Sequence, residues 1–327
     1  MEGMERHGID AATGAAIVEQ LKGFADFGFP ESHAFSFAHI VYASAWLKLR
    51  APEHFYAALL ACQPMGFYSP SSLVHDARRH GVRVAPPDVN HSRVGAVVEE
   101  ADEGEGGVPR APEPVPQAVP LDVDPRLAVR IGLGSIAGLG AAAERTATAR
   151  GEGPYSSVGD LARRARLGEK DLERLAHAGA LASLGASRRE GMWSAGALGA
   201  PRGSVGADGG WQPALPGIDP APAPDLPAMD AVEELRADTE STGLTTGDHP
   251  FALVRAHLDP GALPVSALHG CDDGAIVSVA GLITHRQRPP TAAGTVFLTL
   301  EDESGMVNVT CAAGMWAAHR AAALRAR

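Results

Sequence analysis

Apolar residues recur at helical spacing over most of residues 1–94 and alternate at strand spacing only towards the end of the chain. The helical pattern is strongest between Gly28 and Lys48, where it predicts a helix with one buried face. Pro30 suits the first turn of this helix, where a missing N–H costs little. Residues 1–27 predict an earlier helical segment. The repeating apolar positions are Phe37, Val41, Ala45 and Leu49 in the strong helix, and Ile17, Val18, Leu21 and Phe24 in the earlier one.

Two more helices and a short strand follow. Pro52 predicts a helix over residues 52–60, and Ser69-Pro70 predicts an N-cap and first helical position for a helix that ends near Gly81. Residues 82–85 predict a strand. A basic cluster near the second helix end has two interpretations, a solvated helix end or a contact to DNA phosphates. Its members are His75, Arg78, Arg79 and His80.

In the middle of the chain, the sequence predicts two helix-hairpin-helix units after a strand at residues 129–133. In the first unit, Gly138 and Gly140 allow the positive φ of a tight turn and let backbone N–H groups approach a DNA phosphate, while Leu139 fills the core. Residues 172–181 repeat the pattern. Positive charge comes from Arg145, Arg163, Arg164, Arg166 and Lys170. The alternative is a helical packing module that does not touch DNA, and the second turn, at Gly179, could be purely structural.

The last part of the chain carries the strongest strand pattern. Helices are predicted over residues 229–238 and 249–257, and then strands over residues 276–282, 296–300 and 306–310. The run from Glu301 to Gly305 is read as a solvated hairpin tip. Arg286 and Arg288 follow the first strand and are candidates for contact with a single strand of DNA, although no aromatic stacking platform is evident.

The distribution of charge along the chain bears on whether it binds DNA. The net charge of −11 argues against a nucleic-acid partner, but two windows, residues 95–125 and 204–240, each carry eight acidic residues against one arginine. The rest of the chain is net +3. Residues 95–125 are rich in Pro and Gly, so we predict a flexible insertion there, and residues 194–228 predict a low-complexity linker.

No run of residues approaches the roughly 18 apolar positions that a membrane span needs, and no signal-peptide pattern opens the chain. Cys62, Cys271 and Cys311 are far apart and odd in number, as is typical of reduced thiols. We therefore expect a cytoplasmic protein that binds no membrane.

Three stretches resemble the fingers region of bacterial C-family DNA polymerases, the relatives of the DNA polymerase III alpha subunit. They are GFPESHAFSFAHIVYASAWLK at residues 28–48, QPMGFY at 63–68 and DARRHGV at 76–82. Glu31 and the QPMGFYSP run are similar to the error-prone, damage-associated branch, because replicative relatives usually carry lysine at the position of Glu31. Residues 154–161 and 294–305 resemble the segment between the hairpins and an OB-fold of the same family.

The resemblance implies a role in damage-induced, translesion DNA synthesis and repair. Ser32 and His33 would lie near the triphosphate of the incoming dNTP, the hairpins would hold the duplex backbone, and the OB-fold would lie near the single-stranded template. Accessory translesion proteins are further expected partners. In the family, the Mg²⁺-binding carboxylates lie in a palm domain upstream of this sequence. We therefore assign this chain no catalytic residue, no metal ligand and no bound cofactor, and whether it is an enzyme by itself stays open.

The expected fold is mainly α with a small β part. We read the chain as the C-terminal portion of a polymerase, with a start that falls inside the fingers and with too few strands to close an OB barrel. The alternatives are a stand-alone, non-enzymatic DNA-binding module and a decayed remnant. The predicted segments are the fingers at 1–94, the insertion at 95–125, tandem helix-hairpin-helix units at 126–193, a linker at 194–228, a helical connector at 229–270 and a truncated OB-fold at 271–327.

Overall fold

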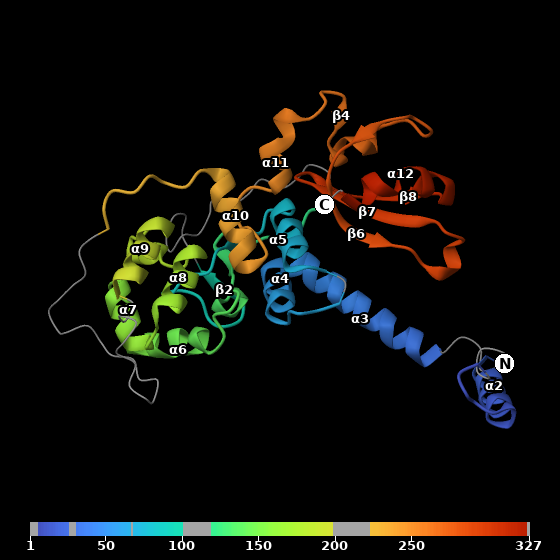
Figure 1. The fold of residues 1–327 in the computed structure, drawn as a ribbon, viewed down its shortest axis with the longest axis horizontal. Coiled ribbons are helices and arrows are strands. Elements are labelled where there is room, and N and C mark those ends of the chain that lie inside the picture. Colours follow the sequence, from blue (N-terminus) through green and yellow to red (C-terminus); the bar gives the residue numbers. More distant parts are fainter. Residues whose placement is uncertain (1–5, 26–30, 67, 101–118, 199–222, 326–327) are drawn as a thin grey trace. The chain divides into compact units, whose positions relative to one another are not determined.

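A computed structural model describes residues 6–25, 31–66, 68–100, 119–198 and 223–325 (Figure 1). The chain divides into two compact units, Met1–Leu47 and Lys48–Arg327. The first unit contains α2 (Ala11–Ala25) and most of α3 (Glu31–Arg50). Asp10 caps α2, because its carboxylate accepts a hydrogen bond from the N–H of Thr13 at 2.9 Å. The predicted helices of this region are therefore present. Pro30 lies outside the described residues.

The buried face predicted for α3 is wrong. Phe37 is 54% exposed and Val41 is 63% exposed. Phe35, Ile40, Tyr42 and Trp46 are exposed as well, so large apolar side chains surround the helix. Helical spacing identifies a face that could pack, but it does not supply the surface that covers it.

The second unit begins with a helix pair against a small sheet. Helix α4 (Pro52–Ala61) has Pro52 at its first position, and α5 (Pro70–Arg79) is capped by Ser69, whose hydroxyl accepts from the N–H of Ser72 at 3.1 Å. Strand β1 (Arg83–Ala85) follows α5. The two helices, β1 and β3 (Leu127–Arg130) share a core that contains Tyr56, Val74, Val84 and Val129. Helices α4 and α5 and strand β1 appear where the sequence predicted them, whereas β3 overlaps the strand predicted at residues 129–133 only at Val129 and Arg130.

The small sheet contains a strand that composition did not predict. Strand β2 (Val97–Glu100) pairs antiparallel with β3, which pairs parallel with β1, giving the order β1-β3-β2. Fully buried Arg130 on β3 donates two hydrogen bonds, at 2.6 and 2.9 Å, to Glu99 on β2. The prediction that residues 95–125 lack secondary structure is therefore wrong at β2. Residues 101–118 lie outside the described part.

Among the described residues, the tandem hairpins form the largest core. The elements are η2 (Leu133–Ser135), α6 (Ala141–Ala149), η3 (Arg150–Glu152), α7 (Val158–Ala165), α8 (Glu169–His177), η4 (Ala182–Leu184) and α9 (Arg188–Leu198). Leu139, Leu161, Leu172 and Leu175 are buried together in this core. Leucines at helical spacing on α8 explain why one of its faces is buried while its acidic and basic residues face outward. Helix α9 extends four residues past the predicted start of the linker, at residue 194.

The C-terminal part contains helices α10 (Ala231–Thr242), α11 (Pro250–Val254) and α12 (Ala313–Arg325), with η5 (Arg255–His257), η6 (Val265–Gly270) and η7 (Pro290–Ala292). Asp230 and Glu233 form a capping box at the start of α10. The strands are β4 (Ala262–Leu263), β5 (Ser278–Val279), β6 (Leu282–Gln287), β7 (Val296–Asp302) and β8 (Gly305–Cys311).

These strands form two sheets. Strands β6, β7 and β8 make an antiparallel meander whose inner side packs Val296 and Leu298 against Trp316 of α12, and β4 pairs with β5. A closed five-stranded barrel is not formed by the described strands, so the OB-fold is not confirmed. The mainly α fold class with a small β part is confirmed. No described helix is both long enough and apolar enough to cross a membrane.

Candidate nucleic-acid interface

The turn at Gly138–Gly140 has the geometry of a backbone anion site. Gly138 has φ +74° and Gly140 has φ +49°, while Leu139 between them is buried. The N–H of Ala137 donates to Ser241 at 2.7 Å, and that of Leu139 donates to Ile136 at 3.1 Å. Within the described part of the chain, nothing accepts a hydrogen bond from the N–H of Gly138 or Gly140. These two donors stand at the N-terminal end of α6, where the helix dipole favours an anion.

The second turn, at Gly179, differs in this respect. Its N–H donates to Ala176 at 2.9 Å, and the N–H of Ala180 donates to Leu175 at 2.9 Å. The carbonyl of Ala180 accepts from Val89. The backbone groups of this turn are therefore used inside the protein, which favours the structural interpretation of the second turn.

The arginines of the hairpin region have different surroundings. Arg163 on α7 has a 64% exposed side chain and pairs with Asp160 at 2.7 Å. The neighbouring Arg164 is only 15% exposed, lies 4.5 Å from the Tyr155 ring centroid, and donates to the carbonyls of Ala149 and Gly153 at 2.8 and 2.6 Å. Only the first of these two side chains is available to a ligand in this arrangement.

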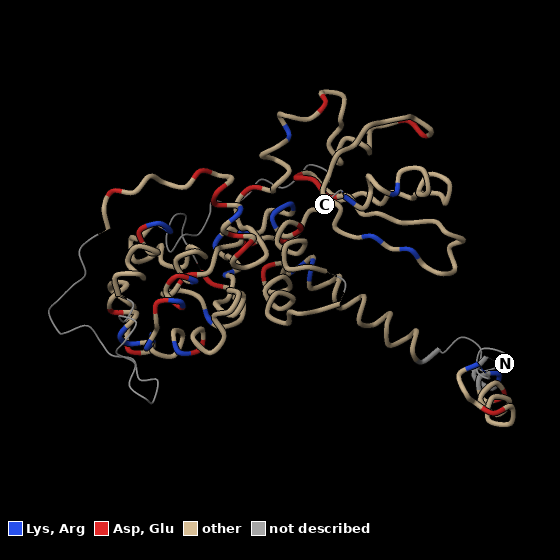
Figure 2. Tube along the Cα trace, viewed as in Figure 1, with Lys and Arg blue, Asp and Glu red and all other residues tan. Residues whose placement is uncertain are grey.

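Arg145 also uses part of its hydrogen-bonding capacity inside the protein. Its guanidinium donates to the carbonyl of Ala165 at 3.1 Å and to Asp171 at 3.3 Å. Figure 2 shows Lys and Arg interleaved with Asp and Glu along this region. Because opposite charges neutralise each other locally, the positive field at the first hairpin is weaker than the arginine count suggests.

The two residues predicted near the nucleotide lie on the first turns of α3. His33 is exposed, and its ring centroid is 4.5 Å from that of Phe37 in an edge-on contact. The side chain of Ser32 lies outside the described residues. No other described group joins His33 to form a site.

One face of the β6-β7-β8 sheet carries an aromatic surface that sequence reasoning missed. A depression there is lined by Tyr68, Phe297 and Met306, with His285, Gln287, Thr299 and Asn308. Alternation along β7 puts Phe297 outward while Val296 and Leu298 are buried, and this signal was available in the sequence. No signal in the sequence indicated that Tyr68 would line the same depression, because Tyr68 comes from a distant segment. Arg286 is exposed and donates to the carbonyl of Ala323 at 2.6 Å, and Arg288 is exposed nearby.

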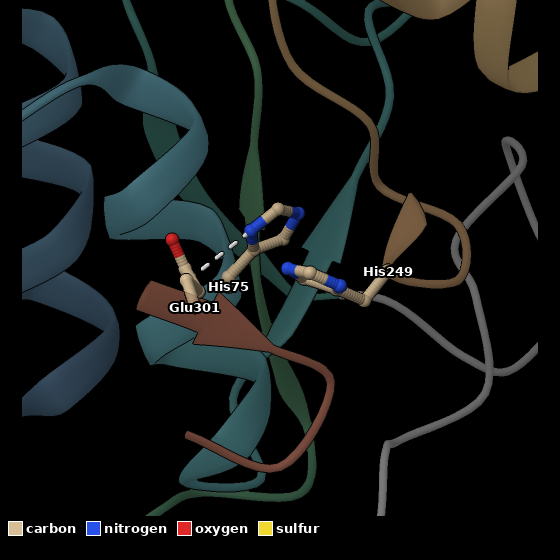
Figure 3. Close-up of side chains that lie close together, drawn as sticks. All are labelled: His75, His249 and Glu301. Carbon is tan, nitrogen blue, oxygen red and sulfur yellow. Dashed lines mark ion pairs between the residues drawn. The ribbon is translucent and has the colours of Figure 1, made fainter. Parts of the chain in front are cut away.

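In the cluster at the end of α5, His75 and Arg79 are buried and Arg78 and His80 are half-buried, so the interpretation as a solvated helix end is wrong. Arg79 donates to Glu301 of β7 at 2.8 Å, and His75 lies 3.4 Å from the same carboxylate oxygen (Figure 3). Arg78 donates to the carbonyl of Thr246. The contacts to Glu301 join α5 to the C-terminal sheet, and the Arg78 contact joins it to the segment between α10 and α11.

The hairpin predicted over residues 301–305 is present, with its turn at Glu303 and Ser304, but the predicted solvation of Glu301 and Asp302 is wrong. Glu301 is 2% exposed and Asp302 is fully buried, because β7 extends through both residues. Burial by itself opposes ionisation of Glu301, but the nearby His75 and the hydrogen bond and positive charge of Arg79 outweigh it and lower the pKa. Arg255 pairs with Asp302 at 2.7 Å. Three consecutive acidic residues gave no indication of these distant basic partners.

Comparison with known proteins decides the family. The profile described as "Helix-hairpin-helix motif" matches residues 81–191. An error-prone DNA polymerase of Mycobacterium tuberculosis (strain ATCC 25618 / H37Rv) is 46% identical over 312 residues, covering 93% of this chain and 25% of the relative. An error-prone DNA polymerase of Nocardia farcinica is 45% identical over 331 residues, covering 98% of this chain and 26% of the relative. One of Azoarcus sp. strain BH72 is 44% identical over 332 residues, covering 100% of this chain and 28% of the relative.

The chain belongs to the error-prone branch of the C-family DNA polymerases. This confirms the resemblance found in the sequence. The chain spans about a quarter of the length of these relatives. The helix-hairpin-helix match, together with the polymerase relatives, points to DNA as a partner.

Proposed function

We propose that this chain is the part of an error-prone DNA polymerase that holds the DNA backbone, with the turn at Gly138–Gly140 as the main contact. The observation that carries the proposal is the pair of N–H donors at Gly138 and Gly140, which are exposed and lack an internal acceptor in the described structure. Backbone donors at a helix N-terminus bind phosphate without reading sequence. A polymerase that moves along any template needs this property.

The aromatic surface of the β6-β7-β8 sheet supports a second contact, to single-stranded template. Phe297 and Tyr68 offer ring faces on which bases stack, and Asn308 and Gln287 offer polar groups at the edge. Arg286 and Arg288 add positive charge at the end of β6, although Arg286 lies on the α12 face of the sheet, opposite Phe297. His33 and Ser32 at the start of α3 are proposed to contact the incoming dNTP in the complete polymerase.

Polymerase chemistry uses two Mg²⁺ ions held by clustered carboxylates, which the family places in its palm. The proposed role here is therefore positioning, and the translesion activity, its accessory proteins and the dNTP belong to the complete enzyme. We expect the purified 327-residue chain to bind DNA without extending a primer. Measurable primer extension by this chain would overturn that expectation.

The binding test uses fluorescence anisotropy with labelled duplexes of two unrelated sequences. We expect equal affinities for both, falling with salt at a slope of about −0.9 per phosphate neutralised. Gly140→Ala should weaken binding roughly tenfold, because alanine is strained at φ +49°, ψ −127° although no atom lies within 4 Å of the added Cβ. The matched control is Gly151→Ala, which also meets open space and has no positive φ. Equal affinity for all three proteins would contradict the proposal.

A further inference from the structure

Three potential metal ligands from separate segments converge inside the second unit (Figure 3). His75 lies on α5, His249 caps the start of α11, and Glu301 lies on β7. One ligand atom from each residue can be chosen so that all lie within 4.8 Å of one another. All three residues are buried, with exposed fractions of 6%, 8% and 2%. The segments are far apart in the sequence, so only the fold brings these side chains together.

The imidazoles of this cluster have unused nitrogens. Both ring nitrogens of His75 and Nε2 of His249 are buried without a hydrogen-bond partner. His75 Nδ1 is 3.4 Å from Glu301 Oε1, but the geometry does not make a hydrogen bond. A buried polar atom without a partner is costly, and an ion or an ordered water normally explains it. The space between the two imidazoles and the carboxylate is where such a group would satisfy all three.

The ligand types suit a divalent transition metal. Imidazole nitrogens and a carboxylate oxygen are groups that Zn²⁺ and related ions bind in proteins.

We propose that His75, His249 and Glu301 bind a divalent transition-metal ion, with Zn²⁺ as the best fit, which fastens α5, α11 and β7 together. Zn²⁺ accepts imidazole and carboxylate ligands in a tetrahedron, with water in the fourth position. Bonds of about 2.0–2.2 Å require the ligand atoms to draw closer than they lie here. No step of DNA binding depends on this ion.

Two existing contacts compete with the ion. His249 Nδ1 accepts a hydrogen bond from the N–H of Phe251 at 3.1 Å. Coordination through Nε2 moves the ring proton to Nδ1, so this bond must break, which lowers affinity roughly tenfold. Arg79 also holds Glu301 at 2.8 Å and opposes a second cation electrostatically. Affinity should therefore be lower than that of a structural site with four ligands.

The test measures metal content and stability of the complete chain. The protein is stripped with a chelator, given one equivalent of Zn²⁺ and desalted, and zinc is quantified by mass spectrometry. We expect about one ion per chain and a Tm raised by several degrees, since the ion binds the folded state. His75→Gln and Glu301→Gln should retain at least tenfold less zinc. The matched control, His269→Gln, removes an exposed histidine of the same unit and should behave as wild type.

Two outcomes would overturn the proposal: wild-type protein that retains no zinc, or variants that retain as much zinc as wild type, which would indicate an adventitious ion only. Because the variants could fold poorly, Co²⁺ is bound to the wild-type chain as a second measurement. Four-coordinate Co²⁺ absorbs visible light strongly, whereas a surface-bound, six-coordinate ion absorbs weakly. The weak spectrum would also contradict a buried site.

Discussion

At the scale of single residues, the same side-chain type performs different work depending on where the fold places it. Arg163 and Arg164 are adjacent on α7, and both were predicted to bind DNA. Arg163 points outward with one acidic neighbour, whereas Arg164 lies over the Tyr155 ring and donates to backbone carbonyls. Helical geometry separates neighbouring residues by about 100°, so one can face solvent while the next is buried.

The two arginines provide a matched pair of variants. Arg164→Ala removes the donor to the carbonyls of Ala149 and Gly153, and we expect a loss of about 2–4 kcal/mol in the free energy of unfolding. Arg163→Ala removes one surface ion pair and should cost at most about 1 kcal/mol. Urea unfolding of both variants measures the difference. Equal losses of unfolding free energy in the two variants would show that the hydrogen bonds of Arg164 do not stabilise the fold.

Glu53 gives a pH-dependent prediction. Its burial raises the pKa, while backbone hydrogen bonds from its own N–H and from Asp124 act in the opposite direction. Below pH 4.5 the carboxyl is protonated in both states, so it contributes no pH dependence. As pH rises from 4.5 through the raised pKa of the folded state, the unfolded chain loses its proton first, and stability falls.

Glu53→Gln should remove this fall. The amide oxygen of glutamine can still accept from the N–H of Asp124, which lies 2.8 Å from the carboxylate. We expect the stability of the variant relative to wild type to increase between pH 4 and pH 7, measured by urea unfolding across this range. Glu144→Gln, at an exposed position of α6, is the control and should show no such trend. A difference that does not vary with pH would argue against the prediction.

At the scale of elements, strand β2 shows the limit of composition. Its sequence, Val97–Glu100, lies within an acidic segment rich in Pro and Gly, yet it completes the small sheet. Val98 packs on the core of α4 and α5, and Glu99 pairs with buried Arg130. These two contacts and the backbone pairing with β3 stabilise the strand, and none of them has a local signal in the sequence.

Adjacent acidic residues of β2 test this view. Glu99→Ala leaves the Arg130 guanidinium buried with only the carbonyl of Pro86 as partner, so we expect a loss of about 3–5 kcal/mol in stability. Glu100→Ala, at the exposed end of the strand, should change stability by less than about 0.5 kcal/mol. Thermal unfolding distinguishes the two. Similar small losses would show that β2 adds little to the fold.

At the scale of the whole molecule, the two units differ in how well they bury apolar surface. The second unit has cores around the hairpins, the small sheet and the C-terminal meander. The first unit exposes large apolar side chains along α3, including Phe35, Val41 and Tyr42. Contiguous exposed apolar surface of this kind promotes association.

We therefore expect the 327-residue chain to self-associate as its concentration rises. Replacing Phe35, Val41 and Tyr42 by serine should reduce association, as measured by sedimentation velocity. Val232→Ser removes an isolated exposed valine on α10 and is the control, which should associate as wild type does. A wild-type chain that stays monomeric at high concentration would contradict the prediction.

The sequence by itself determined most helices of the first half of the chain, the helix start at Ser69-Pro70, the glycine turn at Gly138 and Gly140, and the family. These features depend on local chemistry: Ser69 and Pro70 specify a helix start, and Gly138 and Gly140 permit positive φ regardless of distant partners. Tertiary structure alone decided which charges are buried. Glu301 pairs with Arg79 and His75, which lie more than two hundred residues away from it along the chain. Burial depends on packing that no local pattern records. The same reason explains why the buried His75, His249 and Glu301 cluster was visible only after folding.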